Sequence, residues 1–311
     1  MSKEERKVTR YLGYVVSKDG NVIDGMRYGQ PMRDDQFEEF IRVVGITAEL
    51  RTFVIDFIAL EENFRAFDRI PSDFRTHLEA LNNMMTEGAL SEAMRLMKAQ
   101  NALSNFLYAT SAFRDRCLTR LRESYGEQSS HYTSFEIAIK AAYDEALEYR
   151  VLYNLRNFAQ HHDIPLSLVP VEANLNVETK KVEASVSIVL APSHLAKSSL
   201  VQKSFRPELS RLTEDINLCA YARVYFRLHA RLLKTILDNQ ASRIDEMSAY
   251  REAVTRVLKL PSGAHPVVWE GDVLEHRGTV GNARFIHFSF DELNLILVLY
   301  EHAERVCVGD K

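Results

Sequence analysis

The sequence contains few cysteines and no long apolar run. Its three cysteines, Cys117, Cys219 and Cys307, are too far apart for a disulfide framework or a zinc knuckle, and such usage is typical of a reducing compartment. The longest purely apolar run, Leu295 to Tyr300, is far shorter than the roughly 20 residues that a membrane helix needs. The polar N-terminus lacks the pattern of a signal peptide. We therefore expect a cytoplasmic protein that does not enter a membrane.

An excess of basic residues is also missing. The formal net charge is -4, so the chain lacks the overall positive charge of a non-specific nucleic-acid binder, although a local basic cleft remains compatible with it. No internal repeat, heptad array or low-complexity tract is present. Hydrophobic residues make up 46% and charged residues 26% of the chain, which is typical of a globular protein with a substantial core.

Hydrophobic periodicity predicts a mainly α fold, an up-and-down helical bundle with small β-hairpin additions. The expected divisions are an N-terminal β-hairpin over 1–33, a helical bundle over 34–260 with a β insert at 166–190, and a small α/β extension over 261–311. Within these divisions, the pattern predicts helices at 34–68 with a break near Gly45, 73–85, 90–122, 133–161, 207–239 and 244–258, and a last helix from Asp291.

The strongest functional signal is a short motif, RNFAQH, at residues 156–161. It lies at the end of the predicted helix 133–161. Asn157 and His161 are four residues apart, so they share one helical face, and Arg156 lies about 100° away around the axis. A cation, an amide and an imidazole therefore gather on the last turn.

These three groups suit the cleavage of a phosphodiester without a metal ion. Arginine holds phosphate through two parallel hydrogen bonds. Histidine exchanges protons near neutral pH, so His161 could assist the attack of a ribose 2′-hydroxyl or protonate the leaving group. Arg156 would stabilise the charge that builds on phosphorus.

The motif resembles the signature of the HEPN superfamily, which is an arginine, a polar residue that is often asparagine, three further residues and a histidine near the end of a bundle helix. The literal match covers six residues, and a compatible helical pattern extends over about 90–240. The resemblance implies a metal-independent endoribonuclease in which Arg156, Asn157 and His161 of two copies form one composite site across a homodimer. The β segments depart from the compact family pattern and leave the RNA target unspecified.

Further candidates lie on neighbouring helices. A stripe on the helix 90–122 is polar in its middle, and by resemblance Ser111 or Asp115 would lie beside the motif, with Tyr153 on the motif's own helix. Arg223, Arg227 and Arg231 share one face of a later helix, either as a solvated surface or as contacts to RNA phosphates. No His-Glu-x-x-His or Cys/His cluster is present, so we expect neither a metal nor a cofactor.

Three functions remain open at this stage. The first is a HEPN-like ribonuclease acting in a toxin–antitoxin system or in antiviral defence against phage, with RNA such as tRNA as substrate and an inhibitory or activating protein as partner. The second is a non-catalytic helical adaptor or antitoxin-like protein built on the same bundle. The third is an enzyme that uses a different, unrecognised pocket.

Overall fold

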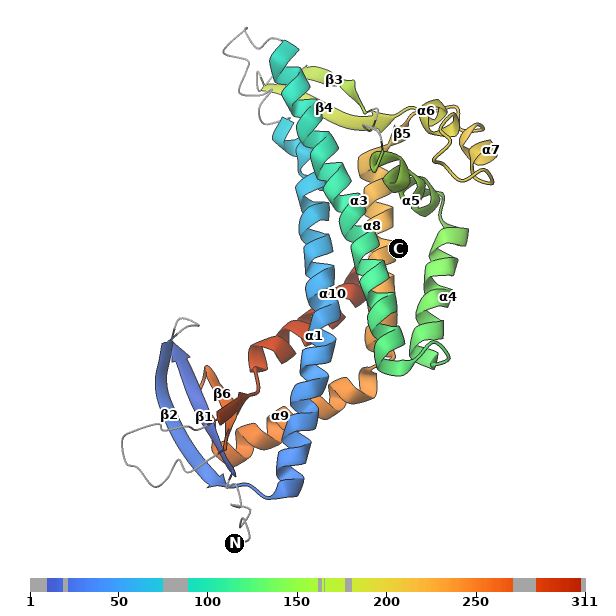
Figure 1. The fold of residues 1–311 in the computed structure, drawn as a ribbon. Coiled ribbons are helices and arrows are strands. Elements are labelled where there is room, and N and C mark those ends of the chain that lie inside the picture. The colour runs from blue at the N-terminus through green and yellow to red at the C-terminus, as the bar shows by residue number, and fades with distance from the viewer. Residues whose placement is uncertain are drawn as a thin grey trace. The chain divides into compact units, whose positions relative to one another are not determined.

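The structure is a computed structural model that describes residues 10–18, 22–74, 89–161, 164, 166–176, 181–270 and 284–308. The fold is mainly helical with small antiparallel sheets, as predicted (Figure 1). The chain divides into two compact units, which are described separately. Unit 1 comprises 1–54 and 237–302, and unit 2 comprises 55–236 and 303–311. The three segments expected from the sequence do not coincide with these units.

Unit 1 contains a four-stranded antiparallel sheet in the order β2-β1-β6-β7. Its strands are β1 (Arg10–Lys18), β2 (Val22–Pro31), β6 (Ala264–Glu270) and β7 (Arg284–His287). The two β segments that the sequence predicts near opposite ends of the chain therefore join in one sheet. Val15, Val267 and Trp269 are buried together on one of its faces.

Three helices accompany this sheet: the first part of α1 (Asp34–Asp68), α9 (Ala241–Leu258) and most of α10 (Phe290–Val308). Two contacts show that helices α1 and α9 run antiparallel. Arg243 of α9 pairs with Glu49 of α1 at 2.7 Å, and Tyr250, later in α9, contacts Phe40, earlier in α1, edge to face.

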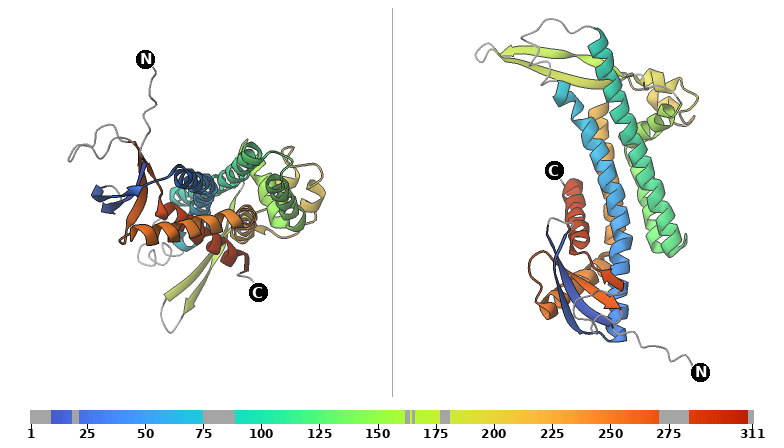
Figure 2. Two further views of the ribbon diagram at one scale, coloured as in Figure 1. Left: turned by 90° about the horizontal axis from the view of Figure 1, so that it is seen from below. Right: turned by 60° about the vertical axis from the view of Figure 1, so that its left-hand side comes forward.

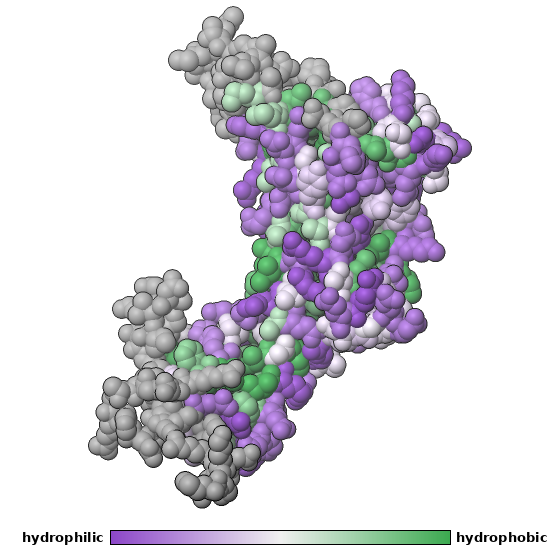
Figure 3. Space-filling model, viewed as in Figure 1, coloured by the Kyte–Doolittle hydropathy of each residue, from purple (hydrophilic) through white to green (hydrophobic). Residues whose placement is uncertain are grey.

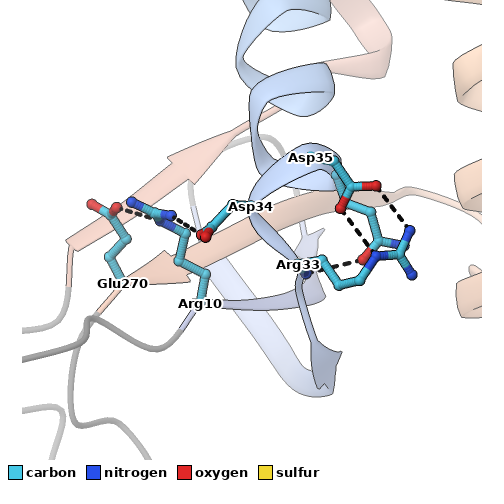
Figure 4. Close-up of polar contacts among 6 residues, drawn as sticks. Arg10, Arg33, Asp34, Asp35 and Glu270 are labelled. Carbon is cyan, nitrogen blue, oxygen red and sulfur yellow. Dashed lines mark hydrogen bonds and ion pairs between the residues drawn. The ribbon is translucent and has the colours of Figure 1, made fainter.

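Arg10, the first residue of β1, forms hydrogen bonds with both β6 and the first turn of α1. Its Nε donates to Glu270 of β6 at 2.8 Å, and its Nη1 donates to Asp34 at 3.0 Å (Figure 4). The guanidinium also lies 3.9 Å from the ring centroid of Phe37. Asp34 and Asp35 occupy the first turn of α1, where negative charge is favourable.

Unit 2 is built around long helices: the rest of α1, α3 (Ala89–Tyr125) and α8 (Leu218–Asp238). Aromatic rings join them, since Phe226 of α8 stacks on both Phe57 and Phe64 of α1, and Phe57 contacts Phe113 of α3. Buried Asp56 also accepts hydrogen bonds from Arg116 and Arg120 of α3. Helices α4 (Ser130–Glu145) and α5 (Leu147–Ala159) pack on α3.

The predicted hairpin after the motif is present as β3 (Ser167–Asn176) and β4 (Lys181–Leu190). It projects from the helices of unit 2 as a two-stranded ribbon (Figure 2). A short strand, β5 (Ile216–Asn217), pairs with the end of β4. Two short helices, α6 (Pro192–Ala196) and α7 (Arg206–Leu209), lie between β4 and β5 along the chain.

Several element boundaries differ from the prediction. Helix α1 has no break at Gly45, because Val43, Ile46 and Thr47 are buried on either side of it and their packing outweighs the weak helix propensity of glycine. The helix predicted from 207 begins instead at Leu218, after β5. The helix predicted over 73–85 lies almost wholly outside the described residues.

The single helix predicted over 133–161 is wrong, because Ala146 is extended (φ -115°, ψ 120°) and separates α4 from α5. Arg150 explains the break. Its Nη1 donates to the carbonyl oxygens of Tyr143 and Asp144, at 2.8 and 2.9 Å, which a continuing helix would have used. Its Nε and Nη2 donate to the Glu208 carboxylate at 3.1 and 2.6 Å.

The outer surface of unit 2 is mainly hydrophilic on the face seen in Figure 3. Among the described helices, none combines the length and the apolar character that crossing a lipid bilayer requires.

Replacing Arg150 with Ala should destabilise the protein by about 2 kcal/mol, because it removes a charged hydrogen-bond fork from a side chain that is only 18% exposed. Urea unfolding followed by circular dichroism measures this loss. Lys140→Ala, at an exposed position of α4, is the matched control and should change stability by less than about 0.5 kcal/mol. Equal stability of the two variants would contradict the role given to Arg150.

Candidate functional site

Arg156 and Asn157 lie on the last turn of α5, and both are half-buried. Nη1 of Arg156 donates to Oδ1 of Asn157 and to Oε1 of Gln160, both at 3.2 Å. Among the described residues, no carboxylate forms an ion pair with Arg156, and its buried Nε has no hydrogen-bond partner. The guanidinium is therefore held by neutral amides, and its charge is not neutralised by a described acid.

His161 is exposed and follows the C-cap residue Gln160. Its backbone N–H donates to the carbonyl oxygen of Phe158 at 3.1 Å, so the helical turn continues to the imidazole. Two side chains of α3 fix this end of α5. The Tyr108 hydroxyl donates to the carbonyl oxygen of Ala159 at 3.3 Å, and Nε2 of Gln100 donates to that of Ile164 at 2.7 Å.

The two helical segments that meet here carry charge of one sign only. Residues 94–114 of α3 and 149–161 contain arginine, lysine and histidine but no aspartate or glutamate. Arg114 and Arg150 are paired with acids from outside these segments, at Asp115 and Glu208. The remaining cations, such as exposed Lys98, leave these two segments with a net positive charge in a chain of net negative charge.

Among the described residues, neither Ser111 nor Asp115 of α3 forms a hydrogen bond or an ion pair with the motif. Asp115 is exposed and pairs with Arg114 at 2.8 Å, and the Arg114 guanidinium lies 5.2 Å from the ring centroid of Tyr153. Asp115 and Tyr153 are thus linked through Arg114. Burial is the largest single influence on the pKa of Arg114 and would lower it, but the hydrogen bond to Asp115 and the charge of Asp115, together with Tyr149 and Tyr225, raise it by more. Ser111 is buried, at 6% exposure.

The three arginines of α8 have different environments. Arg223 is exposed and pairs with Asp68 at 2.9 Å, Arg227 is half-buried, and Arg231 is exposed. Because Arg223 already has an acidic partner, its charge is partly neutralised. Arg231 is exposed and has no acidic partner among the described residues, so its charge is not neutralised by one of them.

Three side chains that hold the motif were not among the sequence candidates. Gln160 accepts a hydrogen bond from Arg156. It lies four residues after Arg156, and this spacing could have indicated the contact, because such residues are neighbours on a helix. Tyr108 and Gln100 lie on α3, and only the packing of α3 against α5 reveals their role.

The other face of α5 enters a buried aromatic cluster. Tyr149 contacts Tyr225 and stacks on His229, with ring centroids 4.9 and 5.7 Å apart. Nδ1 of His229 lies 2.8 Å from the carbonyl oxygen of Tyr225 and must carry the proton, since a carbonyl can only accept. Burial lowers the pKa of His229 to about 4, and burial raises the pKa of Tyr149 and Tyr225.

His229 should make the protein less stable in mild acid. In the unfolded chain a histidine takes up a proton below about pH 6.5, whereas folded His229 stays neutral down to about pH 4. Between these values the unfolded state binds more protons, so this group should lower the free energy of unfolding by about 2 kcal/mol between pH 6.5 and 5.

His229→Gln does not titrate and keeps a donor for the Tyr225 carbonyl, so urea unfolding at pH 7 and pH 5 should show a smaller acid loss than in the wild type. His194→Gln, at an exposed position, should keep the wild-type acid loss. If His229→Gln loses as much stability as the wild type, the neutral buried imidazole is refuted.

The described residues include no group of three or more histidine, cysteine, aspartate or glutamate side chains placed to hold a metal ion. The end of α5 carries a cation held by amides and, five residues later, an exposed imidazole, groups that can bind a phosphate and transfer a proton. Comparisons with models of known protein families, with curated proteins and with solved structures found no match to this chain.

Proposed function

We propose that this chain is a metal-independent, HEPN-like endoribonuclease that acts as a homodimer in the cytoplasm. The observation that carries the proposal is the end of α5. There Arg156 has no carboxylate partner among the described residues, and exposed His161 follows within the same positive segment. A phosphate would supply the negative charge that this arrangement lacks.

The chemistry needs only these groups and the substrate. The ribose 2′-oxygen attacks phosphorus, and an imidazole takes its proton. The bond to the 5′-oxygen then breaks, that oxygen is protonated by an imidazolium, and a 2′,3′-cyclic phosphate is left. In a dimer the two copies of His161 would divide the two proton transfers between them. Arg156 would stabilise the phosphorane charge, and Asn157 would position Arg156 through the hydrogen bond of 3.2 Å.

An exposed apolar stripe on α3 supports the homodimer. Met94, Met97 and Tyr108 are 50%, 51% and 39% exposed. Tyr108 also donates to the last residue of α5, so the stripe runs beside the motif. A second copy that covered this stripe would remove apolar surface from water and bring a second motif close to the first.

The biological setting follows from the resemblance. A toxin or a phage-defence effector that cleaves RNA such as tRNA would require an inhibitory or activating protein partner. The same α3 stripe favours one alternative, a non-catalytic adaptor that binds another protein through Met94, Met97 and Tyr108. An adaptor would cleave no RNA.

Replacing His161 with Ala should reduce RNA cleavage at least 100-fold without changing the melting temperature, because the side chain is exposed and acts only in proton transfer. The assay is incubation of the purified protein with total RNA and with tRNA in EDTA. His194→Ala, another exposed histidine of unit 2, should cleave like the wild type. Full activity of His161→Ala would refute the assignment, and an inactive wild type would favour the adaptor.

Replacing Met97 with Asp should convert the dimer to monomers and abolish cleavage, since it places a charge in the apolar interface. Light scattering coupled to size-exclusion chromatography gives the mass in solution. Ile137→Asp is the matched control, because Ile137 is 68% exposed on α4 and lies away from the stripe in the sequence. A Met97→Asp variant that stays dimeric and active would exclude this stripe as the interface.

A further inference from the structure

Unit 1 contains a cavity of about 970 Å³ between β1 and the antiparallel helices α1 and α9. Leu12 and Tyr14 of β1 line one wall, and Tyr250 and Val254 of α9 line another. The volume reaches the upper end of the range for small-molecule sites, which combine an apolar lining with a few polar groups. All the described lining residues belong to unit 1, and none of them belongs to the motif on α5.

The wall formed by α9 leaves apolar surface uncovered. Ala249 and Ala253 are four residues apart and share one helical face, and their small side chains leave room above the helix. Val257 continues this face and is 70% exposed, the largest exposure among the large apolar side chains described. An apolar occupant would remove this surface from water.

The acidic and the basic residues that line the cavity lie toward opposite ends of it. Phe40 contacts Tyr250 and Arg42 pairs with Glu246, so the antiparallel register places Glu39 and Glu246 toward one end. Arg33 and Lys259, which also line the cavity, lie toward the other end.

Two of these four charges are already paired. Glu246 is paired with Arg42, and Arg33 is paired with Asp35 at 3.0 Å (Figure 4). Glu39 and Lys259 form no ion pair with any described residue. Glu39 is level with Tyr250, so the two charges are nine helical residues apart, or roughly 13 Å at 1.5 Å per residue.

We infer that this cavity binds a short apolar peptide with free ends, its ammonium group at Glu39 and its carboxylate at Lys259. An extended peptide spans about 3.3–3.6 Å per residue, so three or four residues match the distance between the two charges. The four charged residues among the described lining sum to zero, which disfavours a polyanion such as RNA or a nucleoside triphosphate. Burial, and then Glu39, raise the pKa of Tyr250, so its phenol keeps its proton and can donate to a peptide carbonyl.

Titration calorimetry of the full-length protein with the tetrapeptide Leu-Ala-Val-Leu tests this inference. The peptide with free ends should bind, and acetylation of its amine or amidation of its carboxylate should each weaken binding at least tenfold. Glu39→Gln should remove the preference for the free amine, and Lys259→Gln should remove the preference for the free carboxylate. Both side chains are exposed, so these variants should keep the wild-type melting temperature.

Two more variants locate the site. Ala253→Trp fills the cavity and should abolish binding of every peptide form, whereas Arg256→Gln, on α9 but outside the lining, should bind like the wild type. The inference is overturned if free and blocked peptides bind equally, if none binds the wild type, or if AMP or laurate binds in their place. RNA cleavage is measured separately, so failure of this site and failure of the nuclease proposal are distinguishable.

Discussion

The Arg150 guanidinium sets the geometry on which the candidate site depends. It satisfies the last carbonyl groups of α4 and pairs with Glu208, so α5 must start in a new direction at Ala146. Buried Asn154 reinforces this one turn later, since it donates to the Arg150 carbonyl and accepts from the backbone N–H of Gln202. The direction of α5 in turn determines where Arg156 and His161 emerge beside α3.

Elements with strong local signals were predictable from the sequence. The hairpins β1–β2 and β3–β4 follow from alternating apolar residues, and α3 and α9 from helical periodicity. The break at Ala146 was not predictable, because no glycine or proline marks it, and Glu208, which holds the Arg150 side chain that caps α4, is 58 residues away from Arg150. Strand β5 has only two residues and exists through its pairing with β4, which leaves no periodic signal.

In the candidate site too, local spacing predicts some features, and others depend on contacts between distant parts of the chain. Helical spacing predicts Arg156, Asn157 and His161 around the last turn, and Asn157 accepts a hydrogen bond from Arg156, whereas the second partner of Arg156, Gln160, was not among the candidates. Asp115 has several arginines near it along the helix, and residue spacing alone could not show that its partner is the adjacent residue Arg114. Nor could it reveal the aromatic cluster of Tyr149, Tyr225 and His229, which joins α5 to α8. The HEPN resemblance stays a prediction.

The pairing of β1 with β6 has a consequence for synthesis. Tyr14 faces Pro266, a partner that a ribosome adds about 250 residues later. At 5–20 residues per second this delay lasts roughly 10 to 50 seconds, whereas a hairpin forms within microseconds. The β1–β2 hairpin must therefore wait with one unpaired edge while the whole of 55–236 emerges and folds. Such an edge can pair with another nascent chain, so aggregation during synthesis is a hazard specific to this hairpin until β6 arrives.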